Sequence, residues 1–204
     1  MTIEKVILIH GLGGGRIDMW PLARHFRRQG YDTVVWKYPS FRQRIERVAD
    51  RFGRELSSQE LEFPHHRFHI VTHSMGGIVL RKALMSWRLQ RLGRVVLLSP
   101  PNKGSHVARR LAPCLGWMLP SLYQLSDSPL SFVNSLSNPF KQQGIEFGIV
   151  EASKDRVIAQ GGVDLEGNQD YVSVKGHHGL LPWYPETIRL ADQFIQNGRF
   201  QPTS

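Results

Sequence analysis

The stretch that most constrains the fold is a short apolar run that ends at a serine and continues directly into two glycines. Residues 68–72 read as a buried strand, Ser74 follows it, and Gly76 and Gly77 open an amphipathic helical run. A strand that turns into a helix through one serine is typical of a nucleophile elbow, where a strained backbone holds the hydroxyl clear of the sheet. The pattern predicts a reactive serine in an α/β fold, although Thr72 stands where the common pattern has glycine.

The rest of the chain alternates between apolar runs and helical patterns. Five further strands are expected at 6–10, 33–37, 94–99, 146–150 and 171–174. Continuous apolar runs are typical of parallel strands that are buried on both faces. We therefore expect an α/β fold, with a mostly parallel central sheet of about six strands and helices on both faces.

Helices are expected between these strands. One extends from Asp18, as its N-cap, through Pro21 in the first turn to about Gln29. Another follows Arg42, because its apolar positions recur with helical spacing while its arginines take the other face. The last helix follows Pro185.

The length of 204 residues suits a single domain, 1–204. Residues 102–140 differ from the rest because prolines interrupt their short apolar pieces. Two interpretations stay open for this segment: a buried, irregular excursion of the core, or a lid or pocket wall over the serine. The segment Pro101–Ser105 reads either as part of that pocket or as a turn into a helix capped by Ser105.

Composition narrows the partners. A net charge of +9 raises nucleic acid and anionic membrane as options. A solvated arginine-rich surface is the simplest reading; no nucleic-acid-binding motif supports the first option, and weak association with an anionic membrane surface is the better of the two. The chain has no apolar run long enough for a transmembrane helix, and Cys114 is its one cysteine. We expect a cytoplasmic protein without an internal disulfide, with peripheral association to the membrane as an open option.

A glycine-rich loop, 11–15, follows the first strand. Dinucleotide binding is disfavoured because Arg16 stands where a third glycine is needed. The alternative is an oxyanion loop, whose glycines let backbone amides turn toward a developing negative charge. His10 would then brace the loop.

A serine follows the third expected strand, an aspartate the fifth and a histidine the sixth. Carboxyl ends of parallel strands meet at one edge, so these groups can form a Ser-His-Asp triad. Ser74 is the nucleophile, and the histidine is His177 or His178. Asp155 is the preferred acid, with Asp164 and Asp170 as its competitors.

Three segments resemble those of small bacterial lipases and esterases of the α/β-hydrolase superfamily. His10–Gly14 resembles their oxyanion loop, Thr72–Gly77 their nucleophile elbow, and Gly176–Leu181 their histidine segment. The resemblance implies an ester-cleaving serine hydrolase without metal or organic cofactor. It favours His177 as the base beside Ser74 and Asp155.

The same resemblance implies that the backbone N–H groups of Leu12 and Met75 form the oxyanion hole, with Gly11 and His73 at the substrate. A metal site at His65, His66 and His69 is disfavoured because no carboxylate or cysteine completes the set.

The expected substrate is a lipid or another hydrophobic acyl ester. Acyl transfer or thioester cleavage by the same triad stays open, as does a non-catalytic scaffold that binds anionic membrane or a partner. Oligomeric state is not predicted.

Overall fold

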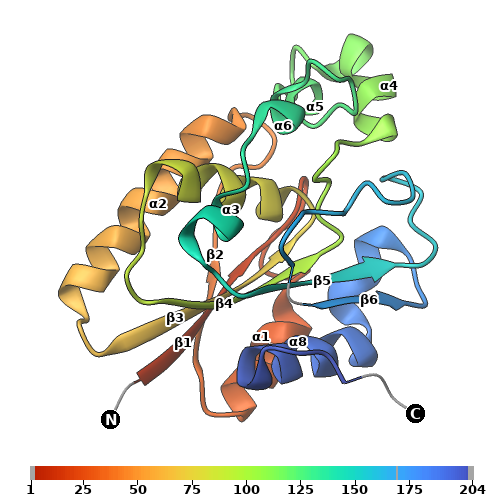
Figure 1. Cartoon of the computed structure of the whole chain (residues 1–204). Coiled ribbons are helices and arrows are strands. Elements are labelled where there is room, and N and C mark those ends of the chain that lie inside the picture. Colours follow the sequence, from red (N-terminus) through yellow and green to blue (C-terminus); the bar gives the residue numbers. More distant parts are fainter. Residues whose placement is uncertain (1–2, 169, 202–204) are drawn as a thin grey trace.

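One six-stranded parallel sheet runs through the protein (Figure 1). The computed structural model describes residues 3–168 and 170–201. The strand order is β2-β1-β3-β4-β5-β6, and all neighbouring strands are parallel. The strands are β1 Ile3–Ile9, β2 Asp32–Trp36, β3 His66–His73, β4 Leu92–Leu98, β5 Phe147–Ala152 and β6 Asp170–Val174. The predicted sheet is confirmed, and its strands end together at one edge.

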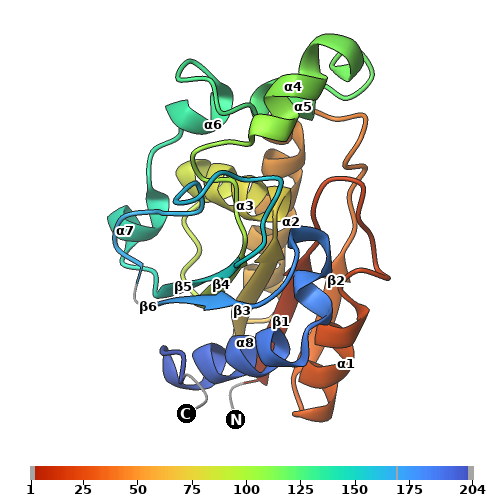
Figure 2. The ribbon, with the colours of Figure 1, turned by 90° about the vertical axis from the view of Figure 1, so that its right-hand side faces the viewer.

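Helices cover both faces of this sheet (Figures 1 and 2). The helices α1 Trp20–Arg28 and α8 Pro185–Asn197 pack on one face, and α2 Ile45–Glu62 and α3 Met75–Ser86 pack on the other. The predicted apolar face of α2 is buried: Ile45, Val48, Ala49, Phe52 and Leu56. None of the helices in the described part of the chain is both long and apolar enough to cross a membrane.

The start of α1 differs from the prediction. The helix begins at Trp20 with Met19 as its N-cap, and Pro21 does lie in its first turn. The carboxylate of Asp18 instead accepts a hydrogen bond from the N–H of Gly15, at 2.6 Å. The prediction that Asp18 caps the helix is therefore wrong, because the carboxylate serves the preceding glycine loop.

Residues 102–140, which we call the cap, are more helical than the sequence suggests. They hold α4 His106–Leu115, α5 Ser121–Gln124 and α6 Phe132–Ser135, and lead into α7 Pro139–Gln143. Helices α4 to α6 lie above the carboxyl edge of the sheet (Figure 1). The cap's buried apolar side chains join the core that contains α2 and α3. Ser105 caps α4, which is one of the two interpretations left open for this segment, since its hydroxyl accepts the N–H of Ala108 at 3.2 Å.

The buried side chain of Arg81 ties the cap to α3. Its guanidinium donates to the carbonyl of Asn102, at 3.2 Å, and to those of Leu136 and Ser137. Those carbonyls lie at the two ends of the cap. Burial lowers the pKa of Arg81 to about 10, so the guanidinium stays charged at neutral pH. The helix that begins at Ser74 therefore fixes both ends of the cap.

A second anchor of the cap is Gln124 on α5. Its carboxamide oxygen accepts the N–H of Ile45 at 2.8 Å, and its nitrogen donates to Glu46. The N-terminal end of α2 is thereby joined to the cap.

Candidate active site

Ser74 lies between β3 and α3, and its backbone is strained. Its φ of 51° and ψ of −124° fall in a region that L residues rarely adopt. The turn is also closely packed, since a methyl group at Gly76 would lie 2.6 Å from the carbonyl oxygen of Ile9. The structure therefore has the sharp strand-to-helix turn that the sequence predicts.

The side chains of Ser74, His178 and Asp155 form a chain of two hydrogen bonds. Nε2 of His178 lies 2.8 Å from the hydroxyl oxygen of Ser74. Nδ1 of His178 lies 2.6 Å from Oδ2 of Asp155. When Nδ1–H donates to the carboxylate, Nε2 is left as the acceptor of the serine proton. The arrangement can therefore activate the hydroxyl by proton transfer.

The histidine that meets Ser74 is thus His178, and the preference for His177 is corrected. The backbone at His177 is extended, with φ −106° and ψ 150°, so adjacent side chains point in opposite directions. His177 is exposed, whereas His178 is buried. The N–H of His177 donates to the hydroxyl of Tyr184 at 3.0 Å. This contact, which the sequence analysis missed, comes from the residue next to α8.

Asp155 follows β5 and receives hydrogen bonds on both oxygens. Oδ2 faces His178, while Oδ1 accepts the N–H groups of Val157 and Ile158 at 2.8 and 3.0 Å. Burial disfavours the charged carboxylate, but the hydrogen bond and charge of His178 and these backbone bonds outweigh it and lower the pKa of Asp155. The group therefore stays a carboxylate at neutral pH.

The two competing aspartates lie in other contacts. Asp164 pairs with Lys103 at 3.4 Å. Asp170 accepts the backbone N–H groups of Tyr171 and Phe200 at 2.9 and 2.6 Å. Neither occupies the place beside His178 that Asp155 fills.

The glycine loop passes directly beside the serine. A methyl group at Gly11 would lie 3.0 Å from the Cβ of Ser74. The next residues along the two segments are Leu12 and Met75. Among the hydrogen bonds of the described residues, none uses the N–H of Leu12 or of Met75. These two amides are free to donate to a negatively charged oxygen.

Several contacts hold this loop. His10 bonds through Nδ1 to the carbonyl of Gly11 at 2.9 Å, which confirms its bracing role. The ring of Tyr38 stacks on His10 at 4.3 Å, and its hydroxyl donates to the His10 carbonyl at 2.6 Å. The N–H of Gly13 donates to the hydroxyl of Ser40 at 3.1 Å. Neither Tyr38 nor Ser40 was predicted from the sequence to support the loop.

His73, which was predicted to lie at the substrate, instead contacts the backbone of His178. It is buried, and its Nε2–H donates to the backbone carbonyl of His178 at 3.0 Å. Burial, with the charge of His178 next, lowers the pKa of His73 to about 4. Its ring therefore stays neutral at neutral pH. Because the ring is buried, it does not lie on a surface that a substrate reaches.

The remaining histidines give no sign of a metal centre. Nδ1 of His69 accepts the N–H of Arg94 at 3.1 Å within the core. Within residues 3–168 and 170–201, no three His, Cys, Asp or Glu side chains gather closely enough to hold a metal ion.

Solved structures share this fold. The mature lipase BlEst2 of Bacillus licheniformis superposes with a TM-score of 0.69 at 16% identity, over 89% of this chain and 87% of that one. The Pyrococcus furiosus esterase Pf2001 gives a TM-score of 0.62 at 16% identity, over 96% and 81%. Phospholipase PlaB of Legionella pneumophila, in complex with thio-NAD, gives 0.62 at 20% identity, over 74% and 38%. The chain thus spans well under half of PlaB.

Among curated proteins, none matches the chain. The model of the alpha/beta hydrolase family matches residues 6–173, from β1 into β6 and across both Ser74 and Asp155. With the parallel sheet and the serine turn, this match is decisive for the family. The chain belongs to the alpha/beta hydrolase family.

Proposed function

We propose that the chain is a serine hydrolase that cleaves carboxylic esters of lipids or other hydrophobic acyl groups. The observation that carries the proposal is the chain of hydrogen bonds from Ser74 through His178 to Asp155. A serine hydroxyl is a weak nucleophile until a base takes its proton, and a third group must fix the tautomer of that base. Side chains at the carboxyl edge of one sheet supply the hydroxyl, the base and the carboxylate.

In the first half of the reaction, the oxygen of Ser74 attacks the ester carbonyl while Nε2 of His178 takes the serine proton. The negative oxygen that forms is held by the N–H groups of Leu12 and Met75, each worth about 3 kcal/mol or more in such a site. The bond from the carbonyl carbon to the alcohol oxygen then breaks. His178 gives its proton to the leaving alcohol, and an acyl-serine remains.

In the second half, water replaces the serine. His178 takes a proton from water, the resulting hydroxide attacks the acyl carbon, and the bond to Ser74 breaks as the proton returns to the serine oxygen. Asp155 stays ionised throughout and stabilises the protonated imidazole. Acid and alcohol are the products, and the triad returns to its starting state.

Apolar surface at the glycine loop supports a hydrophobic substrate. The ring of Phe41 is half-exposed, and a methyl group at Gly13 would lie 3.0 Å from it. This ring can contact an acyl chain whose carbonyl lies at Ser74. The names of the structural neighbours, a lipase, an esterase and a phospholipase, agree with that substrate class. Weak association with an anionic membrane surface forms part of the same proposal.

Hydrolysis of p-nitrophenyl esters of increasing acyl length tests the proposal. We expect turnover that rises from the shortest to the medium or long chains. Ser74→Ala should lower kcat by about 10⁶, as loss of the nucleophile does in such triads. Equal turnover by the wild-type and Ser74→Ala proteins would assign the activity to a contaminant, and no turnover of any ester would refute the proposal.

A further inference from the structure

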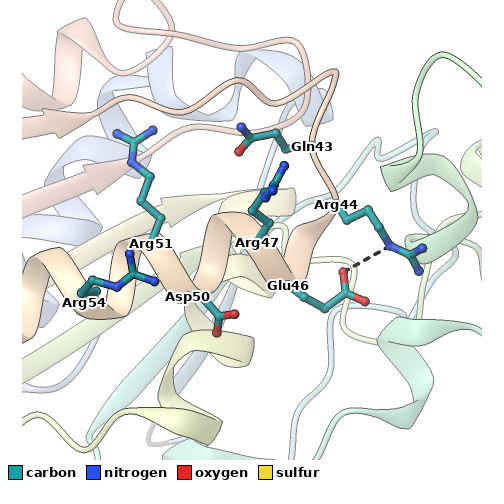
Figure 3. A pocket seen from close by; sticks show the side chains of 7 residues that line it. All are labelled: Gln43, Arg44, Glu46, Arg47, Asp50, Arg51 and Arg54. Carbon is teal, nitrogen blue, oxygen red and sulfur yellow. Dashed lines mark ion pairs between the residues drawn. The ribbon is translucent and has the colours of Figure 1, made fainter.

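A row of arginines follows the exposed face of α2. Arg44, Arg47, Arg51 and Arg54 stand at i, i+3, i+7 and i+10, so they fall on one stripe of the helix. With Gln43, Glu46 and Asp50 they line an open groove of about 700 Å³ (Figure 3). In Figure 3 the side chains of Arg47 and Arg51 extend away from those of Glu46 and Asp50.

The charge of this row is only partly neutralised by the protein. Arg44 pairs with Glu46 at 3.7 Å, and Arg51 with Glu55 at 2.7 Å. No ion pair among the described residues includes Arg47 or Arg54. Like charges at i, i+3 and i+4 destabilise a helix by about 0.2–0.5 kcal/mol per pair. A negatively charged partner would remove that repulsion.

Apolar side chains are exposed beside the row. Helices α4 and α5 lie above the N-terminal end of α2 in both views (Figures 1 and 2), where Gln124 bonds to Ile45 and Glu46. In the segment 111–123, 83% of Trp117 is exposed to solvent, and Leu111, Met118 and Tyr123 are exposed as well. An indole that is this exposed adds little to the core, so its exposure beside three other apolar side chains points to an external apolar contact.

We propose that the arginine row of α2 and the exposed apolar side chains of 111–123 dock together on an anionic lipid surface. A lipid surface offers negative headgroups directly beside an apolar layer, so it matches both parts of this surface. A nucleic acid would match only the arginines. The proposal rests on the proposed function, because docking by this end of the protein brings the carboxyl edge and Ser74 toward lipid esters.

Binding of the full-length Ser74→Ala protein to vesicles tests the docking without hydrolysis. The vesicles contain phosphatidylcholine alone or phosphatidylcholine with phosphatidylglycerol, and flotation at low and high salt measures the bound fraction. We expect binding only to the anionic vesicles, weakened by salt because headgroup attraction is screened. Equal binding to both kinds of vesicle, or none, would overturn the proposal.

Matched double variants locate the surface. Arg47→Gln with Arg54→Gln should weaken binding to anionic vesicles by about thirtyfold, the effect of two cations near a charged membrane. Arg24→Gln with Arg28→Gln removes the same charge from α1, which lies at the opposite end of the molecule (Figure 1), and should leave binding within about twofold. An equal loss in both variants would show that net charge alone attracts the protein, and would overturn the proposed surface.

The apolar part has its own test. Trp117→Ser should weaken vesicle binding by about tenfold at high as well as low salt, since burial of apolar area is not screened. An unchanged affinity for vesicles would show that Trp117 does not belong to the docking surface. Tighter binding of a double-stranded oligonucleotide than of anionic vesicles would show that the arginines serve nucleic acid instead, which also contradicts the proposal.

Activity on a soluble short-chain p-nitrophenyl ester separates this inference from the proposed function. The arginine and tryptophan variants of the otherwise wild-type protein should hydrolyse that ester at the normal rate. Hydrolysis without vesicle binding would refute the docking alone, whereas vesicle binding without hydrolysis of any ester would refute the proposed reaction.

Discussion

The nucleophile elbow and the loop that carries His178 meet through the hydrogen bonds of Ser74 and His73 to His178, but different forces hold them. Close packing fixes the elbow, since a methyl group at Gly76 would lie 2.6 and 2.8 Å from the carbonyl oxygens of Ile9 and His10. In the histidine loop, a methyl group at Gly179 would meet no atom within 4 Å, and one at Gly176 would meet the side chain of Tyr184 instead of a backbone oxygen. That loop is held by hydrogen bonds to the side chains of Asp155, His73 and Tyr184.

This difference separates stability from chemistry. A change in the elbow disturbs the contact between α3 and β1, so it acts on the whole fold. A change in the histidine loop leaves that packing intact and acts on the position or the proton of His178. Mutations in the two regions should therefore differ in what they alter.

The largest expected effect comes from the adjacent histidines. His178→Ala should lower kcat for a p-nitrophenyl ester by about 10⁶, because the serine then has no base. His177→Ala, the matched control, removes an exposed ring and should keep kcat within about threefold, since its contact to Tyr184 is made by the backbone. The reverse order would show that the loop rearranges before reaction.

Asp155→Asn should have the next largest effect. The amide has no charge to stabilise the protonated imidazole. Because its oxygen keeps the backbone hydrogen bonds of Val157 and Ile158, its nitrogen donates to Nδ1 and fixes the wrong tautomer, so kcat should fall by about 10⁴. Asp164→Asn changes an exposed pair with Lys103 and should leave kcat unaltered. Steady-state kinetics of the two variants checks the assignment, and equal losses would contradict it.

Gly76→Ala and Gly179→Ala compare the packing of the two regions directly. The elbow variant forces a methyl group against backbone oxygens and should lose about 2–3 kcal/mol of unfolding free energy. The loop variant has open space and should change by less than about 0.5 kcal/mol. Urea denaturation gives both values. A stable Gly76→Ala protein would mean that the elbow is less tightly packed than its contacts indicate.

The last comparison concerns the pH dependence of stability at His73, next to the elbow. Its pKa is about 4 in the fold and 6.5 in an ordinary environment, so the unfolded chain binds the proton first as the pH falls. The contribution of His73 to stability should therefore be constant above pH 6.5 and decrease from there to about pH 4, with a limiting slope of about 1.4 kcal/mol per pH unit. His69, whose pKa burial also lowers to about 4, should add a decrease of its own.

His73→Gln keeps a donor for the carbonyl of His178 but does not titrate. Urea denaturation between pH 7 and pH 4 should give a flatter curve for this variant than for the wild type. Identical slopes would show that His73 does not remain neutral in the fold.

The sheet could be predicted because its strands are buried on both faces and read as uninterrupted apolar runs. Ser74 and Asp155 could be predicted for a related reason, since each comes soon after such a run. Their positions depend on where a strand ends, which is local information. The exact start of α1 could not be predicted from the sequence, because Asp18 can serve either a helix or the preceding loop.

The choice between His177 and His178 could not be made from the sequence. The two residues differ only in which side of an extended segment they face, and Tyr184 and Asp155 fix that direction from a distance. Apart from a helix after Ser105, which was one of two alternatives, the helices of the cap were missed for a similar reason. They are short and proline-interrupted, and they depend on contacts such as those of Arg81 with Asn102 and Leu136.

Labelling with a fluorophosphonate probe, read by intact mass and peptide mapping, tests the central claim most directly. The account predicts one adduct per chain, on Ser74. The adduct should be absent from Ser74→Ala, strongly slowed in His178→Ala and formed at the normal rate in His177→Ala. No adduct on the wild-type protein, while an accepted esterase is labelled in parallel, would contradict the claim that His178 and Asp155 activate Ser74.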